Sequence, residues 1–177
     1  MLCLCETVVD PELLRGLDKL RVLEVVRCKG TLDLNNLPIE TLYLSLGEID
    51  VVETTLPELK RLHLQQTSSL HEKITAPKLE KLELLYGEYS ISNRFPVLQK
   101  LRLDSVKLTT PISELPISKL ILWNRSTFDF ELTNPNVSCL ELVGLPTKVR
   151  LGKFPRLYVL TVKGNCKERI KNLLSLT

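Results

Sequence analysis

Four cationic residues recur along the chain at nearly equal spacing, and together they could bind a negatively charged partner. Consecutive members are 20, 19 and 19 residues apart, and they are Arg61, Lys81, Lys100 and Lys119. A fold that repeats at this interval would place them side by side, about 5 Å apart if they lie on adjacent strands. Such a row attracts acidic protein surfaces or phosphate groups by charge. Arg102 would add positive charge beside it.

Residues suited to catalysis or metal binding are few and scattered. The sequence contains no glycine-rich phosphate loop, no nucleophile elbow and no pair of residues at metal-ligand spacing. Cys139 could be an exposed thiol, but only Lys119 is expected near enough to make it reactive. We therefore expect no catalytic residues, no metal and no cofactor. An odd and dispersed set of cysteines favours reduced thiols, and its members are Cys3, Cys5, Cys28, Cys139 and Cys166.

A leucine pattern with the same interval must position the cations. Each unit contains the core L-x-x-L-x-L, as in Leu59-x-x-Leu62-x-Leu64. Successive side chains of a strand point to opposite faces, so the last two aliphatic residues of each core should point inward and their neighbours outward. The hydrophobic content of 44% with only 5% aromatic residues predicts an aliphatic core. One marker per unit recurs every 19 or 20 residues, at Leu23, Leu42, Leu62, Leu82, Leu101, Leu120, Leu140 and Leu160.

Each core is followed by a return segment that has little room for a helix. Most of these segments end in an apolar residue and proline, and proline disfavours helix in the residue before it. Asn134-Pro135 is the polar exception. We expect extended chain or short strands here, each ending at Leu37-Pro38, Leu56-Pro57, Ala76-Pro77, Phe95-Pro96, Leu115-Pro116 or Phe154-Pro155.

A period near twenty with this leucine pattern resembles the leucine-rich repeat family, in its short class of 19–20 residues per repeat. The matching residues run from Leu2 to Val162. The resemblance implies an α/β, mostly β, right-handed solenoid with a parallel sheet on the concave side and extended chain on the convex side. It also places Cys28 in the core, whereas Cys3 should face outward, so the two are not expected to share a zinc ion.

We expect a single domain that spans residues 1–177. Residues 1–19 should form an incomplete first repeat with a short helix, because Asp10 can cap free amides and Pro11 suits the first helical position. Residues 20–165 should form eight repeats, and residues 166–177 a C-terminal capping helix. The alternative for that last helix is that it binds a partner.

The outward columns of the expected sheet define the candidate binding site. Trp123 would act as an aromatic anchor in an apolar patch with Leu85, Ile121 and Val143, beside the cations. The alternative is that the lysines only keep the sheet soluble, since neighbouring like charges in water cost about 1 kcal/mol or less per pair. The expected partner-binding residues are Tyr43, Arg61, His63, Lys81, Leu85, Tyr86, Lys100, Arg102, Lys119, Ile121 and Trp123.

The resemblance implies a non-catalytic protein-protein interaction module that binds another protein, with an acidic surface, on its concave face. One alternative is the substrate-recognition part of a larger assembly, such as a ubiquitin ligase or an effector. Another is nucleic-acid binding through the basic residues, although a net charge of +3 does not require nucleic acid or a membrane. Without a membrane-spanning run or a signal peptide, we expect an intracellular protein, with a secreted effector as the alternative.

Overall fold

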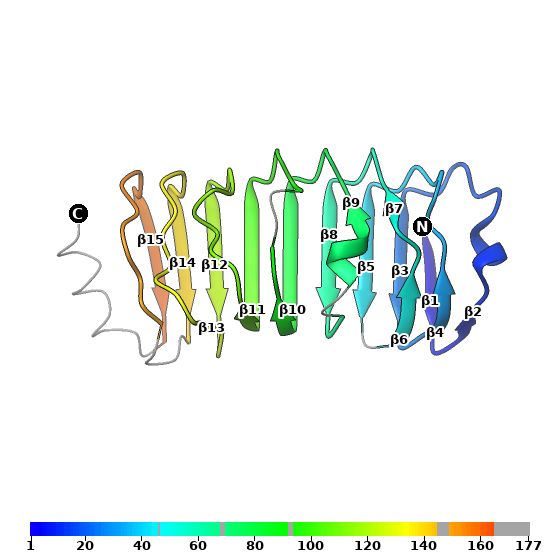
Figure 1. Ribbon diagram of the computed structural model, residues 1–177, viewed down its shortest axis with the longest axis horizontal. Coiled ribbons are helices and arrows are strands. Elements are labelled where there is room, and N and C mark those ends of the chain that lie inside the picture. Colours follow the sequence, from blue (N-terminus) through cyan, green and yellow to red (C-terminus); the bar gives the residue numbers. More distant parts are fainter. Residues whose placement is uncertain (46, 68–69, 92–93, 145–148, 165–177) are drawn as a thin grey trace.

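The protein is a mostly β parallel solenoid of about eight turns with almost no helix (Figure 1). The computed structural model describes residues 1–45, 47–67, 70–91, 94–144 and 149–164. Along the long axis of the molecule, successive turns stack in sequence order (Figure 1). None of the helices within these ranges is long and apolar enough to cross a lipid bilayer.

Nine strands that carry the repeat cores and one short extra strand form a ten-stranded sheet in which all neighbours are parallel. The marker leucines pair directly with one another, for example Leu62 with Leu82 and Leu82 with Leu101, as the repeat predicted. A short strand, β13 (Thr127–Phe128), pairs with the far end of β11. The other strands, in spatial order, are β1 (Leu2–Cys5), β3 (Val22–Val26), β5 (Thr41–Ser45), β8 (Arg61–Gln65), β10 (Lys81–Tyr89), β11 (Lys100–Leu108), β12 (Lys119–Trp123), β14 (Cys139–Val143) and β15 (Val159–Lys163).

The return segments are extended chain and short strands, as the prolines predicted. A three-stranded sheet joins β2 (Val8–Val9), β4 (Lys29–Leu32) and β6 (Glu48–Val51). A second, two-stranded sheet joins β7 (Thr54–Thr55) and β9 (Ile74–Thr75). Stacking these segments turn upon turn satisfies part of their backbone hydrogen bonding without any helix.

The helix expected within residues 1–19 is a single 3-10 turn, η1 (Pro11–Leu14). Asp10 caps it as predicted, since its Oδ1 accepts a hydrogen bond of 2.8 Å from the Glu12 amide. Only Leu14 of the turn is buried, so little apolar surface is present to extend it into an α-helix. A second such turn, η2 (Leu70–Lys73), lies in a return segment. The expected capping helix at residues 166–177 lies outside the described residues.

The core is a stack of aliphatic side chains between the ten-stranded sheet and the return segments. Burial alternates along the strands, and the inward residues of β8 and β11 are fully enclosed. Leu101 and Leu120, for example, have no exposed surface. Each such leucine contributes about 1.5–3 kcal/mol relative to an exposed position, and the contribution requires a neighbouring turn on each side.

A left-handed residue ends the five-residue core of most turns. Backbone φ at these corners lies between 48° and 84°, a region that glycine adopts readily and other residues adopt at a cost of about 1 kcal/mol or more. At most of these corners the chain leaves the ten-stranded sheet for the return segment, whereas β10 and β11 continue past Tyr86 and Ser105 as part of that sheet. The corner residues in the described chain are Glu6, Arg27, Gln66, Tyr86, Ser105, Asn124, Gly144 and Gly164.

Replacing the corner residue Gln66 with glycine should stabilise the protein by about 0.5–1 kcal/mol, because glycine removes the strain of its positive φ. The matched control is Gln65→Gly, one residue earlier in β8, where glycine weakens a strand and also removes the hydrogen bond of 2.9 Å that the Gln65 side chain accepts from Ser45, so it should destabilise by about 1–2 kcal/mol. Urea unfolding of the two variants measures both effects. Changes of the same sign at both positions would contradict the strain explanation.

Candidate functional site

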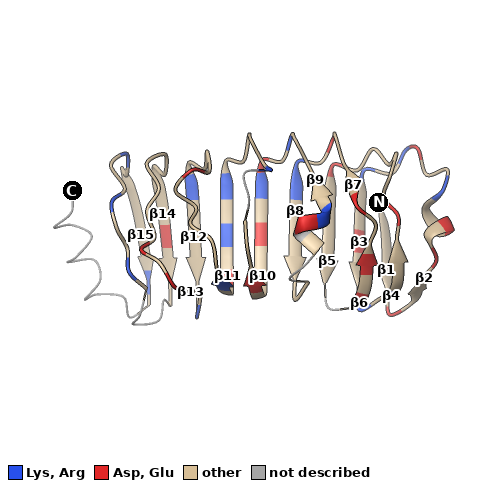
Figure 2. Cartoon of the chain, in the orientation of Figure 1, with Lys and Arg blue, Asp and Glu red and all other residues tan. Residues whose placement is uncertain are grey.

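The four cations at the start of β8, β10, β11 and β12 form a straight row across the strands, which we call the basic row. Arg61 pairs in register with Lys81, Lys81 with Lys100, and Lys100 with Lys119. Figure 2 shows these positive charges at the same end of the four adjacent strands. Parallel strands lie about 4.8 Å apart, so the row extends over about 14 Å.

Backbone hydrogen bonds fix the position of the basic row. The amide of Lys81 donates to the Lys60 carbonyl at 3.0 Å, and the amide of Lys100 donates to the Glu80 carbonyl at 2.9 Å. Arg61 donates in the same way to the preceding turn, at 3.1 Å. Each of these carbonyls also accepts a hydrogen bond from the amide of the residue just before the cation. Two amides therefore attach each turn to the preceding one. The spacing of the row is therefore set by the sheet and not by the side chains.

Many other cations of the solenoid lie opposite a carboxylate of an adjacent turn, but the members of the basic row do not. Within the ranges that the structure describes, none of its four members forms an ion pair. Elsewhere, a cation of one turn commonly pairs with a carboxylate of an adjacent turn at 2.8–3.7 Å, in the pairs Arg21–Glu40, Arg27–Glu6, Lys29–Glu48, Lys60–Glu40, Lys78–Glu58 and Lys107–Glu88. The sequence repeat places a carboxylate opposite those cations but places another cation opposite each cation of the row.

Next to the basic row, a chain of paired charges crosses the middle of the sheet. Glu83 lies 3.3 Å from the Nδ1 of His63 and 3.7 Å from the Arg102 guanidinium. On its other side, Arg102 lies 3.6 Å from Asp104, which accepts a hydrogen bond of 2.7 Å from the Asn124 amide. His63 and Arg102, both predicted to bind the partner, are thus engaged within the protein. The positive charge of Arg102 is largely neutralised.

Trp123 is covered by Arg102 and does not stand out from the sheet. The guanidinium carbon lies 4.1 Å from the centroid of the indole ring, a cation–π contact. The Nε1 of Trp123 and the Nε of Arg102 are buried without a hydrogen-bond partner among the described residues. Ile121, expected in an exposed apolar patch, is only 6% exposed. Beside Trp123, only Leu85 and Val143 of the expected patch remain partly exposed.

Two tyrosines border the site at different distances from the basic row. Tyr43 is 36% exposed, and the centroid of its ring on β5 lies 5.6 Å from that of the His63 ring on the neighbouring strand β8. Tyr86 is 41% exposed at the corner that follows the core of β10. The structure therefore brings Tyr43 into the charged centre and leaves Tyr86 at the margin. That these residues bind a partner stays a prediction.

The pKa of the Glu83 carboxyl is lowered, mainly by the hydrogen bond to His63 and further by the Arg102 charge, while burial opposes the shift. A carboxyl with a lowered pKa in the fold stabilises the protein above its unfolded pKa of about 4.3, and the effect is lost as the pH falls through the folded value. Glu83→Gln should therefore cost about 1 kcal/mol at neutral pH. As the pH falls, the unfolding free energies of the Glu83→Gln variant and the wild type should become equal. Chemical unfolding at pH 7 and at pH 3 tests this, and a constant difference would contradict it.

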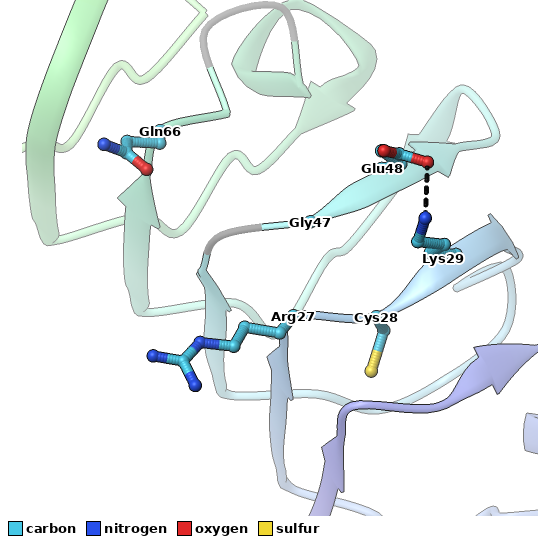
Figure 3. A pocket seen from close by; sticks show the side chains of 6 residues that line it. All are labelled: Arg27, Cys28, Lys29, Gly47, Glu48 and Gln66. Atoms are coloured by element: carbon cyan, nitrogen blue, oxygen red, sulfur yellow. Dashed lines mark ion pairs between the residues drawn. The ribbon is translucent and has the colours of Figure 1, made fainter.

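A shallow hollow of about 410 Å³ lies at the corners of the early turns (Figure 3). Lys29 and Glu48 point toward each other across it and form an ion pair of 3.1 Å. Arg27 extends away and pairs with Glu6 at 2.9 Å. Gly47 is required locally, because a side chain there would overlap the carbonyl oxygen of Cys28. The three charged residues that line the hollow are all engaged in ion pairs, so the basic row is the stronger candidate for a binding site.

The four cysteines that the structure describes do not converge on a metal-ligand site. Cys3 is exposed and Cys28 is buried, as predicted, and the Cys28 thiol donates to the Val26 carbonyl at 3.4 Å. Cys139 is partly exposed beside Lys119 in the sheet register. No group of three potential metal ligands occurs in the part of the chain that the structure describes. Cys166 lies outside it.

Comparisons of the chain with protein-family models, with curated proteins and with solved structures find no significant match. The site is therefore defined by its own geometry. The repeat placed every member of the basic row correctly, but the cover over Trp123 was not predicted. Arg102 pairs directly with Ile121, so Trp123 is its diagonal neighbour, within reach of long side chains. The contact between Arg102 and Trp123 could have been predicted by also considering diagonal pairs of residues on adjacent strands.

Proposed function

We propose that this protein is a leucine-rich-repeat module that binds an acidic surface of another protein through the open face of its ten-stranded sheet, without catalysis. Turns of 19–20 residues, with the L-x-x-L-x-L cores stacked in register, support the family assignment. The proposal includes a right-handed solenoid, because crossovers between parallel strands of one sheet are right-handed in about 98% of cases.

The observation that carries the proposal is the basic row itself, in which four cations in register on adjacent strands form no ion pair among the described residues. A solenoid that only needed solubility could alternate its charges, as it does one residue earlier at Arg21, Glu40 and Lys60. Four adjacent like charges instead create a local positive field, and an acidic partner gains from that field in both encounter rate and orientation.

A protein partner fits the site better than nucleic acid does. Glu83 and Glu141 lie on the same face, and Asp104 holds Arg102, so the basic row is a narrow strip beside carboxylates. A broad phosphate backbone would be repelled by them, whereas a protein surface can present acidic residues to the row and neutral or basic residues beside it.

The triple variant Lys81→Gln/Lys100→Gln/Lys119→Gln tests the proposal by removing three charges from the basic row. The fold should persist, because the three lysines are only partly buried and the substitutions relieve repulsion between them. Partners captured from native extract by the wild type are identified, and the affinity of each for both proteins is measured. We expect the variant to bind the specific partner at least tenfold more weakly.

A matched control, Lys29→Gln/Lys78→Gln/Lys107→Gln, removes the same net charge from cations that already pair with carboxylates. It should keep nearly all of the affinity. Equal losses in the two triple variants would mean that only net charge matters, and would overturn the proposed site. Capture of nucleic acid in place of protein, lost only in the basic-row variant, would replace the protein partner with a nucleic acid.

A further inference from the structure

We infer that the partner element that the basic row recognises is an α-helix with one acidic stripe, lying across the strands. This inference rests on the proposed function and adds the conformation of the partner. Three features of the basic row support the inference: the spacing of its charges, the sign of the charges beside it, and its direction across the strands.

The spacing of the basic row matches a helix better than an extended chain. Its four cations span three strand intervals, or about 14 Å. In a helix, acidic residues at i, i+3, i+7 and i+10 share one face and, at 1.5 Å per residue, span about 15 Å. In an extended chain, side chains on one face recur every second residue, so four of them span about 20 Å. Each acidic residue of the helix can therefore face one cation, whereas an extended peptide loses register by its end.

Carboxylates lie directly beside the basic row, so the acidic stripe of a partner must be narrow to avoid repulsion. Glu80 immediately precedes Lys81, and Glu83 follows two residues after it on the same face of the strand. Glu83 already accepts from His63 and lies beside Arg102, so the next column of the sheet offers no free positive charge around it. A peptide acidic on all sides would place carboxylates against these borders. A helix separates its faces, so neutral or basic residues can flank its acidic stripe.

The direction of the basic row fits the same geometry. The cations follow one another along the long axis of the solenoid, perpendicular to the strands (Figure 2). A helix has a diameter of about 10–12 Å with its side chains, and two columns on the same face of a strand are about 6.7 Å apart. A helix over the row would therefore also cover the neighbouring column that contains His63 and Glu83. That column approaches neutrality through its internal ion pairs, which suits the uncharged flank of such a helix.

Three synthetic peptides of equal length and equal net charge test the inference against the whole chain. The first is a helical peptide with four glutamates in one stripe at i, i+3, i+7 and i+10. The second is a helical peptide of the same composition with its glutamates distributed around the helix. The third is a glycine- and serine-rich peptide with glutamates at every second residue. Binding is measured by the anisotropy of labelled peptide at an ionic strength of about 0.01 M, where charges interact over about 30 Å, and again at about 0.15 M.

We expect the striped helix to bind about tenfold more tightly than either other peptide. Because lysine stems are flexible, the preference should be of this size and not absolute. The Lys81→Gln/Lys100→Gln/Lys119→Gln variant should lose the preference, and the Lys29→Gln/Lys78→Gln/Lys107→Gln variant should keep it. Emission from Trp123, the single tryptophan of the chain, gives a label-free check that the peptide binds on this face.

The outcomes separate this inference from the proposed function. If the extended or the scattered peptide binds as tightly as the striped helix, and binding still depends on the basic row, the helical partner is wrong and the proposed docking face stands. If no peptide binds in a manner that depends on the row, both are wrong. Tighter, row-dependent binding of a single-stranded oligonucleotide than of any peptide would also overturn both.

Discussion

Replacing Asn134 with alanine should lower the free energy of unfolding by about 3 kcal/mol, because it removes three hydrogen bonds between a buried side chain and the backbone, each worth about 0.5–1.5 kcal/mol. The side chain is fully buried, and its amide nitrogen donates to the carbonyls of Ile112 at 2.6 Å and Leu115 at 3.0 Å. Its oxygen accepts from the amide of Asn136 at 2.8 Å. One side chain thus joins two turns of the solenoid, where the other return segments have an apolar residue.

Asn136→Ala is the matched control, two residues away. Its side chain makes one long hydrogen bond of 3.4 Å to the Leu115 carbonyl, so its loss should cost no more than about 1 kcal/mol. Asn134→Asp separates shape from hydrogen bonding, since it keeps the acceptor and the size but removes both donors. It should destabilise at least as much as alanine at neutral pH. Urea unfolding of the three variants provides the measurement, and equal costs for Asn134→Ala and Asn136→Ala would contradict the proposed bridge.

Leu101→Ala should also cost about 3 kcal/mol, since it removes a fully enclosed side chain and leaves a cavity between turns. Leu101 pairs in register with Leu82 on one side and Leu120 on the other, so the cavity cannot close without moving both neighbouring turns. The same residue lies between Lys100 and Arg102 along β11, so the loss of packing also reaches the strand that carries the centre of the basic row.

Leu160→Ala is the corresponding control near the end of the described stack. Leu160 occupies the same position in its turn and pairs with Leu140, but it keeps some exposure to solvent. Its truncation should cost about 1 kcal/mol, because less apolar area is lost and the site can relax. Chemical unfolding of both variants gives the comparison. A cost at Leu160 equal to that at Leu101 would mean that stability does not depend on neighbours on both sides.

The repeat alone predicted the stacking and the composition of the sheet face. A repeat interval of 19 or 20 residues allows only one alignment of adjacent strands, and Leu62, Leu82 and Leu101 pair with one another in that alignment. The same register predicts which charges face each other in adjacent turns, and Lys78 with Glu58 could have been predicted in this way. The positions of the basic row follow from the same rule.

Features that depend on the path of the return segments could not be predicted. Asn134 was recognised only as an exception, because its partners lie 19 and 22 residues earlier, on carbonyls whose direction the pattern does not specify. The corners at Gln66 and Ser105 were also not predicted, since neither residue signals a positive φ as glycine would. The single turn at Pro11–Leu14 shows that a good cap does not by itself make an α-helix.

Because each of four consecutive turns contributes one cation, the length of the basic row can change only by whole repeats. Duplicating one whole unit, such as the residues from Lys81 to Gln99, would insert another positive charge at the same interval of about 4.8 Å and leave both flanking units with neighbours of the kind they already have. Deleting a unit would shorten the surface by the same step. Under the proposed function, a change in the number of repeats would therefore match the row to a longer or shorter acidic ligand without redesign of any single contact.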